Sequence, residues 1–298
     1  MKRLIDRWGP ARTSAAALAV MILLGGVTFE VLKDEPGREM MDCARFSRVV
    51  LMGFAVANPD YSMRFSLVPD DECRPHPDYD DKIPPFDGSL EVSLGPRISG
   101  MWTGEAPALS TEFRQHPSGE IRFPKPRPWR LTETMTSPES QDPKAENLLT
   151  LNTLKEMDWR RHRVHAVVTL KHPLNEAEVD DMHVIGLGET LLLSPGLHGK
   201  SFGWPYVYPG TIGGFNAFAG PKSTSRVEEF RRWVSLLKSE DEPALEQLDL
   251  DLSELRDRAE EGLIYGFTVI NTPEMVKRMV GNPKVRSVSV IDIAPEIP

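Results

Sequence analysis

Histidine side chains can hold a metal ion or transfer a proton, and the later part of this chain has a group of them. Five of them fall between positions 162 and 198, namely His162, His165, His172, His183 and His198. Their spacing argues against a metal site, because a predicted strand begins between His162 and His165 and no His-Glu-x-x-His pattern occurs. We therefore expect solvated or singly hydrogen-bonded histidines, with no metal site and no cofactor.

The two serines nearest to these histidines differ in their surroundings. Ser194 precedes Pro195 and lacks the Gly-x-Ser-x-Gly frame of a hydrolase. Ser201 has this spacing in Gly199-Lys200-Ser201-Phe202-Gly203, but it lies in a predicted loop and not at the strand-to-helix turn that such a nucleophile needs. A phosphate-binding loop ending in Gly-Lys-Ser also needs a glycine at position 194, which is serine here. The sequence assigns no catalytic residue, and an envelope hydrolase using His198 and Ser201 remains the alternative to a non-catalytic protein.

Acidic side chains gather between residues 70 and 81. Acidic residues also outnumber basic ones in the whole chain, which has a formal net charge of −9. Carboxylates can hold calcium, but prolines and Cys73 interrupt this segment and it lacks the alternation of an EF-hand loop. A solvated acidic loop is the expected structure. The negative balance also makes nucleic acid an unsuitable partner, because binding to phosphate backbones depends on clustered lysine and arginine.

The segment from residue 194 to 222 combines glycines with large aromatic rings. Glycine permits a close approach of the backbone and aromatic rings offer large apolar area, a combination typical of recognition loops. The predicted binding residues are Phe202, Trp204, Tyr206, Tyr208, Phe215 and Phe218. They suit a peptide or a sugar, although an irregular loop that folds its rings into a satellite core would give the same pattern.

The N-terminus has the pattern of a membrane segment. Residues 1–12 carry Lys2, Arg3, Arg7 and Arg12, and residues 13–33 are mostly apolar. A run of this length can cross most of a bilayer, and basic residues on its short side orient the N-terminus toward the cytoplasm. We expect a retained single-pass signal anchor with the remaining chain outside the cytoplasm; a cleaved signal peptide is the alternative.

Two cysteines, Cys43 and Cys73, follow this run on the side that is expected to be oxidising. A disulfide between them is the prediction, and buried free thiols are the alternative.

Composition divides the remaining chain near residue 145. Residues 34–145 are rich in proline and acidic residues and form a predicted juxtamembrane region that ends in a linker. In it we expect a helix over residues 46–57, which ends before Asn58-Pro59, and short strands at 90–94 and 120–123. Residues 146–298 form the predicted binding or regulatory domain.

This later part shows strand and helix patterns in a regular order. Residues 165–170 alternate as a strand, and Asn175 with Glu178 marks the capped start of a helix before a strand at 189–193. A strand at 263–270, a helix opened by Thr272-Pro273 and ended by Gly281, and a strand at 285–293 repeat the order. Helices at 225–238 and 252–260 fill the insertion. The fold class expected is α+β, with a ferredoxin-like antiparallel sheet and a helical insertion.

Several of these strings resemble the C-terminal domain of membrane-anchored bacterial sigma-factor regulators. They are the strand at 166–170 with the helix start at 173–179, Phe202-Gly203-Trp204-Pro205, and Tyr265-Gly266-Phe267-Thr268-Val269 followed by a helix and a strand at 285–291. The resemblance implies a domain beyond a single membrane helix that regulates a sigma factor in response to the envelope. The 12 residues before the apolar run are too few to sequester a sigma factor directly, so a membrane or regulatory protein is the expected partner.

The sequence thus predicts a non-catalytic, membrane-anchored, extracytoplasmic binding or sensing module of the bacterial envelope. The alternatives are the anchored hydrolase mentioned above and a protease-inhibitor or propeptide-like domain.

Overall fold

A computed structural model describes residues 41–65, 89–96, 109–116, 120–125, 131–132, 134, 142–155, 157–158, 161–182, 187–194, 202–205 and 225–295. Residues Met40–Pro298 form one compact unit. The predicted anchor and the stub before it lie outside the described residues. Within the described ranges, no helix has both the length and the apolar character needed to cross a membrane.

A continuous helical segment opens this unit and confirms the prediction for residues 46–57. It consists of α2 (Cys43–Phe46), a π-helical turn η1 (Ser47–Leu51) and α3 (Met52–Ala57). Apolar residues occur all round it, and every residue from Met52 to Ala57 is buried, as expected of a helix without a polar face. The segment ends at Asn58, the residue before Pro59, where helical geometry is disfavoured.

Four strands then form an antiparallel sheet in chain order: β1 (Tyr61–Phe65), β2 (Ser89–Pro96), β3 (Leu109–Gln115) and β4 (Ile121–Arg122). Strands β2 and β4 overlap the two short strands predicted from the sequence. Phe113 of β3 packs its ring edge-on against Phe54 of α3, with centroids 5.0 Å apart, so the sheet and the first helix share apolar contacts.

The next helix, α6 (Pro143–Leu154), begins inside the segment that composition assigned to a linker. Asp142 caps it, because its carboxylate accepts hydrogen bonds from the backbone N–H groups of Lys144 and Ala145. Pro143 stands in the first turn, where its missing N–H costs nothing.

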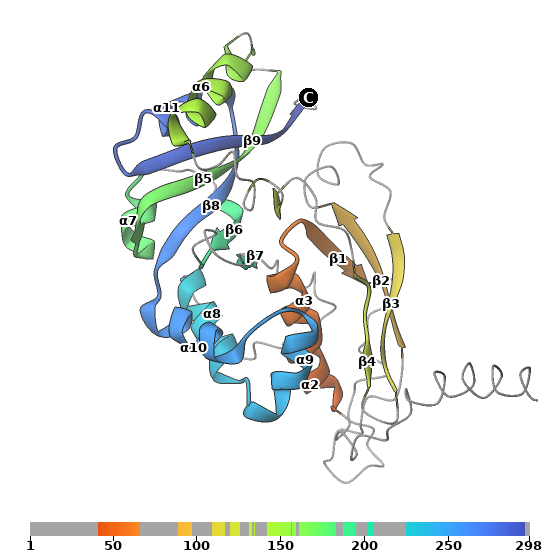
Figure 1. The fold of residues 1–298 in the computed structure, drawn as a ribbon. Coiled ribbons are helices and arrows are strands. Elements are labelled where there is room, and N and C mark those ends of the chain that lie inside the picture. Colours follow the sequence, from red (N-terminus) through yellow and green to blue (C-terminus); the bar gives the residue numbers. More distant parts are fainter. Residues whose placement is uncertain are drawn as a thin grey trace, which may run out of the picture. The chain divides into compact units, whose positions relative to one another are not determined.

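The later part of the chain forms a second antiparallel sheet with helices between its strands (Figure 1). This arrangement confirms the α+β class with antiparallel sheets. Its strands are β5 (His162–Leu174), β6 (Leu187–Leu192), β7 (Gly203–Pro205), β8 (Ile264–Asn271) and β9 (Val285–Pro295). The spatial order is β7-β6-β8-β5-β9, and every neighbouring pair is antiparallel. The predicted alternating face of β5 is buried, including Ala166 and Val168.

The helices between these strands start and stop where the sequence predicts. Helix α7 (Glu176–Asp180) has the expected capping box, in which Asn175 and Glu178 exchange side-chain to backbone hydrogen bonds. Helix α11 (Pro273–Val280) is capped by the Thr272 side chain and ends at Gly281.

The insertion between β7 and β8 contains α8 (Arg226–Ser235), the 3-10 turn η3 (Ser239–Asp241), α9 (Glu242–Gln247) and α10 (Leu252–Glu261). Helices α8 and α10 agree with the predicted ones. Helix α10 ends at Gly262, whose φ of 61° is left-handed and therefore favours glycine.

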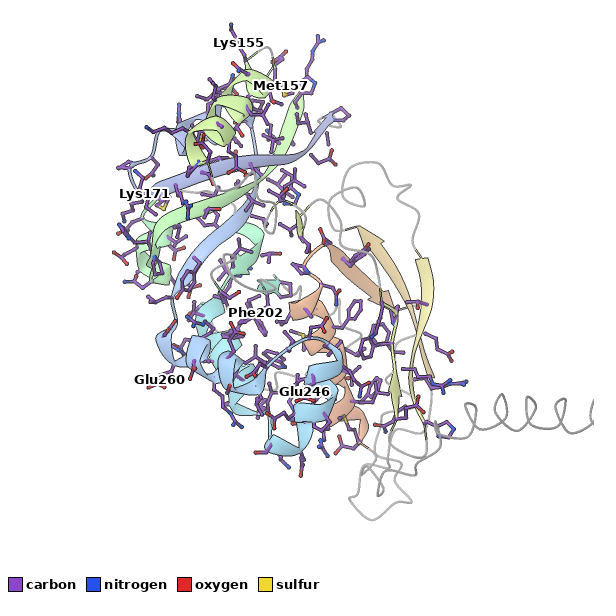
Figure 2. The ribbon with its side chains drawn as sticks, viewed as in Figure 1. Lys155, Met157, Lys171, Phe202, Glu246 and Glu260 are labelled. Carbon is purple, nitrogen blue, oxygen red and sulfur yellow. The ribbon has the colours of Figure 1, made fainter. Side chains whose placement is uncertain are left out.

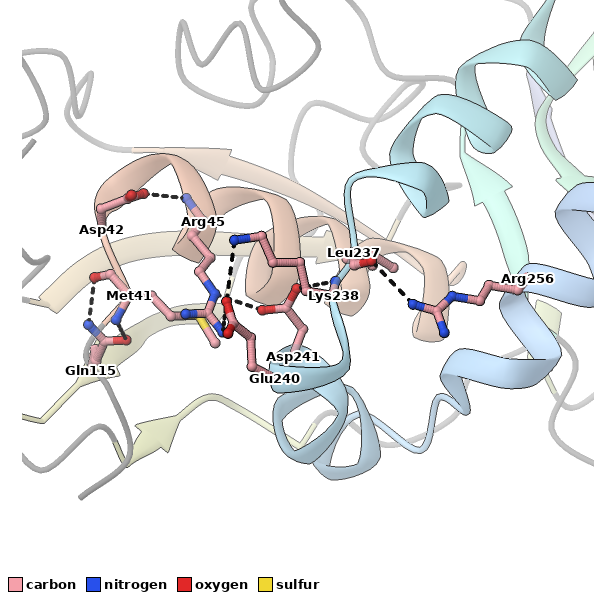
Figure 3. Close-up of polar contacts among 9 residues, drawn as sticks. All are labelled: Met41, Asp42, Arg45, Gln115, Leu237, Lys238, Glu240, Asp241 and Arg256. Carbon is pink, nitrogen blue, oxygen red and sulfur yellow. Dashed lines mark hydrogen bonds and ion pairs between the residues drawn. The ribbon is translucent and has the colours of Figure 1, made fainter. Parts of the chain in front are cut away.

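Charged and polar side chains join the first helix to the insertion and to β3 (Figure 3). The Arg45 Nε group donates to Asp241 Oδ1 at 2.7 Å, and Asp241, which is only 1% exposed, also accepts from the backbone N–H of Lys238. The Gln115 side chain bonds both backbone groups of Met41. Described residues on both sides of position 145 also share one hydrophobic cluster, which includes Phe54 and Trp233.

Candidate functional site

Two of the six predicted binding residues lie in the interior. Phe202 directly precedes β7 and Trp204 lies within it, and they are 4% and 2% exposed, respectively. The other four, Tyr206, Tyr208, Phe215 and Phe218, lie outside the described residues, so their predicted role stays a prediction.

Phe202 and Trp204 belong to a cluster of four rings with Phe230 and Trp233 of α8. The Phe202 and Phe230 rings stack with centroids 6.2 Å apart, and Trp204 contacts Phe230 at 5.5 Å and Trp233 at 5.7 Å. Phe202 is labelled in Figure 2. These separations are favourable for aromatic pairs and add to the apolar area that the rings bury. Both side chains therefore belong to the main hydrophobic cluster, together with Phe54 and Trp233.

The close approach of β7 to its neighbour depends on Gly203. A Cβ atom at this position would collide with the Thr190 side chain on β6 and would crowd the Leu191 carbonyl oxygen. Glycine is thus required for β7 to pair with β6 at this point.

Direct contacts hold the two ends of segment 206–224 together. Arg226, which is 7% exposed, donates from Nη2 to the carbonyl oxygen of Trp204 at 3.1 Å. The Glu176 carboxylate of α7 accepts hydrogen bonds at the other end of the segment, from Ser225 Oγ, the Arg226 N–H and the Val227 N–H. Its charge lies at the N-terminus of α8, where helix N–H groups favour an anion.

Segment 195–201 is closed in a similar way. Its flanking residue Ser194 is buried and accepts a hydrogen bond through Oγ from the backbone N–H of Phe202 at 3.2 Å. This serine therefore holds backbone in place. Ser201, the other serine weighed as a nucleophile, lies outside the described residues.

Acidic groups next to this closure have perturbed proton affinities. Burial raises the pKa of the Glu229 carboxyl above its ordinary value; the Arg226 guanidinium opposes this rise, and the Glu176 charge adds to it. Burial also raises the pKa of Asp180, and repulsion from Glu176 and Asp181 acts in the same direction. Groups from α7, β7 and α8 thus act together on the Glu229 carboxyl.

Sequence inspection did not identify Glu176, Arg226 or Glu229 as parts of the site. Glu176 has only the pattern of an ordinary first-turn acid, and its partners lie about fifty residues further along the chain. Long-range pairing of this kind leaves no local signal.

Three of the five histidines lie in the described residues. His162 Nδ1 is 3.1 Å from the carbonyl oxygen of Asp158, His165 is buried on β5, and His172 is exposed. His183 and His198 lie outside the residues that the structure describes. Among the residues that the structure describes, no group of three or more His, Cys, Asp or Glu side chains could hold a metal ion.

The predicted disulfide cannot be placed. The backbone of Cys43 belongs to α2, while its side chain and the whole of Cys73 lie outside the described parts. The acidic group at 70–81 also falls in a range that is not described.

Comparisons of the chain with protein-family models, curated proteins and solved structures found no significant match.

Proposed function

We propose that this protein is a non-catalytic, membrane-anchored, extracytoplasmic binding or sensing module that acts through a partner protein. The observation that carries this proposal is the closure of segment 206–224 by the hydrogen bond from Arg226 to Trp204. A segment with joined ends on a rigid base is the common arrangement of a binding loop. Its tyrosines and phenylalanines suit a peptide or a sugar.

The fold proposed for the C-terminal part is ferredoxin-like. Strands β5, β6, β8 and β9 follow each other as strand-helix-strand and again strand-helix-strand, and they lie in the order β6-β8-β5-β9. This interleaving of two split units in one antiparallel sheet supports the proposal. Strand β7 and helices α8 to α10 are then additions between the two units.

The rigid base supports a binding role in energetic terms. Four buried rings and the Glu176 carboxylate fix both flanks of the segment before any ligand arrives. A loop with fixed ends loses less conformational freedom on binding than one with free ends, which favours affinity.

The same helix that shapes this base also contacts the segment nearest to the proposed anchor at residues 13–33. Trp233 of α8 donates from Nε1 to the carbonyl oxygen of Arg48 at 2.7 Å, and Arg45 pairs with Asp241 just beyond α8. A ligand that shifted α8 would therefore act on residues that follow the proposed anchor closely in the sequence. We propose this route for the envelope response that the resemblance to sigma-factor regulators implies.

Site-specific photo-crosslinking in intact membranes tests the binding role. A photo-reactive residue at position 208 should give one discrete protein adduct, and Arg226→Gln should reduce it by opening the closure. Arg256→Gln is the matched control, because Arg256 donates to the Leu237 carbonyl oxygen at 3.4 Å and does not touch the base. No adduct, or equal losses in the two variants, would contradict the proposal.

The membrane assignment has its own test. The chain should stay in the membrane fraction after carbonate extraction, and external protease should reach the part after residue 34 in spheroplasts. Release of the chain into the soluble fraction would rule out the proposed topology. The same conclusion would follow if the part after residue 34 resisted protease in intact spheroplasts and was cleaved only after lysis.

A further inference from the structure

Helix α6 exposes three of its four leucines, and only Leu154 is buried. Leu148 is 59% exposed, Leu149 is 67% exposed and Leu151 is 39% exposed, and these are three of the four exposed large hydrophobic residues in the described part of the chain. A helix packed on a sheet ordinarily turns such residues inward. An outward cluster of this kind indicates an interaction surface.

The polar side of α6 is bound to the free edge of β9. The Asn147 amide donates to the carbonyl oxygen of Arg286 at 3.1 Å and accepts from the N–H of Val288 at 2.9 Å. Thr150 Oγ1 donates to the carbonyl oxygen of Val288 at 2.5 Å, and Ser289 bonds to Glu146. Strand β9 lies at the edge of the sheet. The side chains of α6 therefore bond to backbone groups on the side of β9 that has no neighbouring strand.

These bonds determine which way the helix faces. Rotating α6 to bury Leu148 and Leu149 would remove the Asn147 and Thr150 side chains from β9 and leave its backbone groups without these partners. The leucines are therefore held outward by specific contacts on the opposite side of the helix.

Lysines stand at both ends of the exposed leucines. Lys144, Leu148, Leu151 and Lys155 are spaced i, i+4, i+7 and i+11, so they form one stripe along α6. Both lysines are exposed, and Lys155 is labelled at the end of α6 in Figure 2. The one acidic residue inside α6, Glu146, is on the inward side with Ser289. This positive stripe belongs to a chain whose net charge is −9.

The charges decide between possible occupants. In a pair of identical α6 helices, a parallel arrangement would place Lys144 beside its copy, and an antiparallel one would place it beside Lys155. Either arrangement brings like charges together, which disfavours a second copy. The stripe is also narrow, and its leucines have the spacing by which one helix packs on another. A helix that lies on a membrane surface has a broad apolar face, so the narrow stripe disfavours a membrane as the occupant.

We propose that the α6 leucine face, defined as Lys144, Leu148, Leu149, Leu151 and Lys155, docks an amphipathic helix of a partner protein whose apolar stripe is flanked by Asp or Glu. The docked leucines supply the contact area, and the lysines select the partner and fix its register. This surface and the base of segment 206–224 belong to opposite edge strands, β9 and β7. The proposal does not depend on the binding role of that segment.

Two synthetic helical peptides with the same leucine stripe provide the probe, one flanked by glutamates and one by lysines. Their binding to the full-length chain in nanodiscs of neutral lipid can be followed by fluorescence anisotropy. We expect the glutamate peptide to bind at least tenfold more tightly than the lysine peptide. The double substitution Leu148→Asp/Leu151→Asp should weaken it at least tenfold, and Leu236→Asp, which changes an exposed leucine on another element, should leave it unchanged.

Charge reversal gives the sharper result. Lys144→Glu/Lys155→Glu should reverse the order of the two peptides while the thermal unfolding curve stays the same. An unchanged preference, or equal binding by the Leu148→Asp/Leu151→Asp variant, would overturn the proposal. Leucine-dependent binding to phosphatidylglycerol vesicles in place of the peptide would overturn it in favour of a membrane, and leucine-dependent self-association of the chain would do so in favour of a second copy.

Discussion

Helices α8 and α6 attach to the molecule by opposite sides. Helix α8 buries its apolar residues Phe230, Trp233 and Val234, and its polar residues face outward or bind the ends of the neighbouring segment. Helix α6 directs Asn147 and Thr150 inward and leaves three leucines exposed. The apolar pattern alone therefore indicates the packing side of α8 and gives the wrong side for α6, because the free backbone groups of an edge strand are better partners for amide and hydroxyl groups than for leucines.

The largest effect should come from truncating the apolar side of α8. Trp233 is fully buried, contacts the Trp204 and Phe230 rings and bonds to the Arg48 carbonyl oxygen. We expect Trp233→Ala to lower the free energy of unfolding by about 3–5 kcal/mol, since it leaves a cavity and an unpaired carbonyl. Urea unfolding measures this. A loss below about 1 kcal/mol would mean that α8 is not held by its rings.

The polar side of α6 should contribute less but measurably. Asn147→Ala removes two hydrogen bonds to β9, and we expect a loss of about 1–2 kcal/mol in the free energy of unfolding. Asn152→Ala, at an exposed position of the same helix, is the control and should change little. Equal effects of the two substitutions would remove the distinction between the sides of α6.

A smaller, pH-dependent effect is expected on α8. The raised pKa of Glu229 means that the folded state holds this proton more tightly than the unfolded state, so ionisation at neutral pH costs stability. Glu229→Gln should therefore raise the Tm slightly at pH 7. The gain should shrink as the pH falls through the raised pKa, where the native carboxyl is neutral too. A gain that grows on acidification would show that attraction to Arg226 outweighs burial.

The exposed side of α6 should contribute almost nothing to folding. We expect Leu149→Gln to change the free energy of unfolding by less than about 0.5 kcal/mol, because that side chain is 67% exposed in the folded chain. Urea unfolding of this variant and of Trp233→Ala under the same conditions compares the two changes in free energy directly. A loss of several kcal/mol would indicate that these leucines are covered within the molecule itself.

Local signals predicted the later part of the fold well. The caps at Asn175 and Thr272 and the stop at Gly281 each depend on neighbouring residues, and the structure has all of them. The alternation predicted for β5 is present only in part, because every residue from Val164 to Val168 is buried. Strands β1, β3 and β7 and helices α6 and α9 were not predicted. Only one of the four leucines of α6 lies on its buried side, and the bonds of Asn147 join the helix to residues about 140 positions away.

The candidate site was predictable only in composition. The aromatic pattern directed attention to segment 194–222, but it gave no sign that the rings of Phe202 and Trp204 are buried. The closure by Glu176 and Arg226 depends on how α7 and α8 meet, which is a property of the folded chain.

The covering of β9 by Asn147 and Thr150 also has a consequence for solubility. A shortened protein that began after residue 155 would present bare amide and carbonyl groups along this strand to other molecules. Such rows are templates for stacking between chains, which leads to aggregates and fibrils. Purification of the isolated sheet should therefore retain α6, or the product will precipitate during concentration.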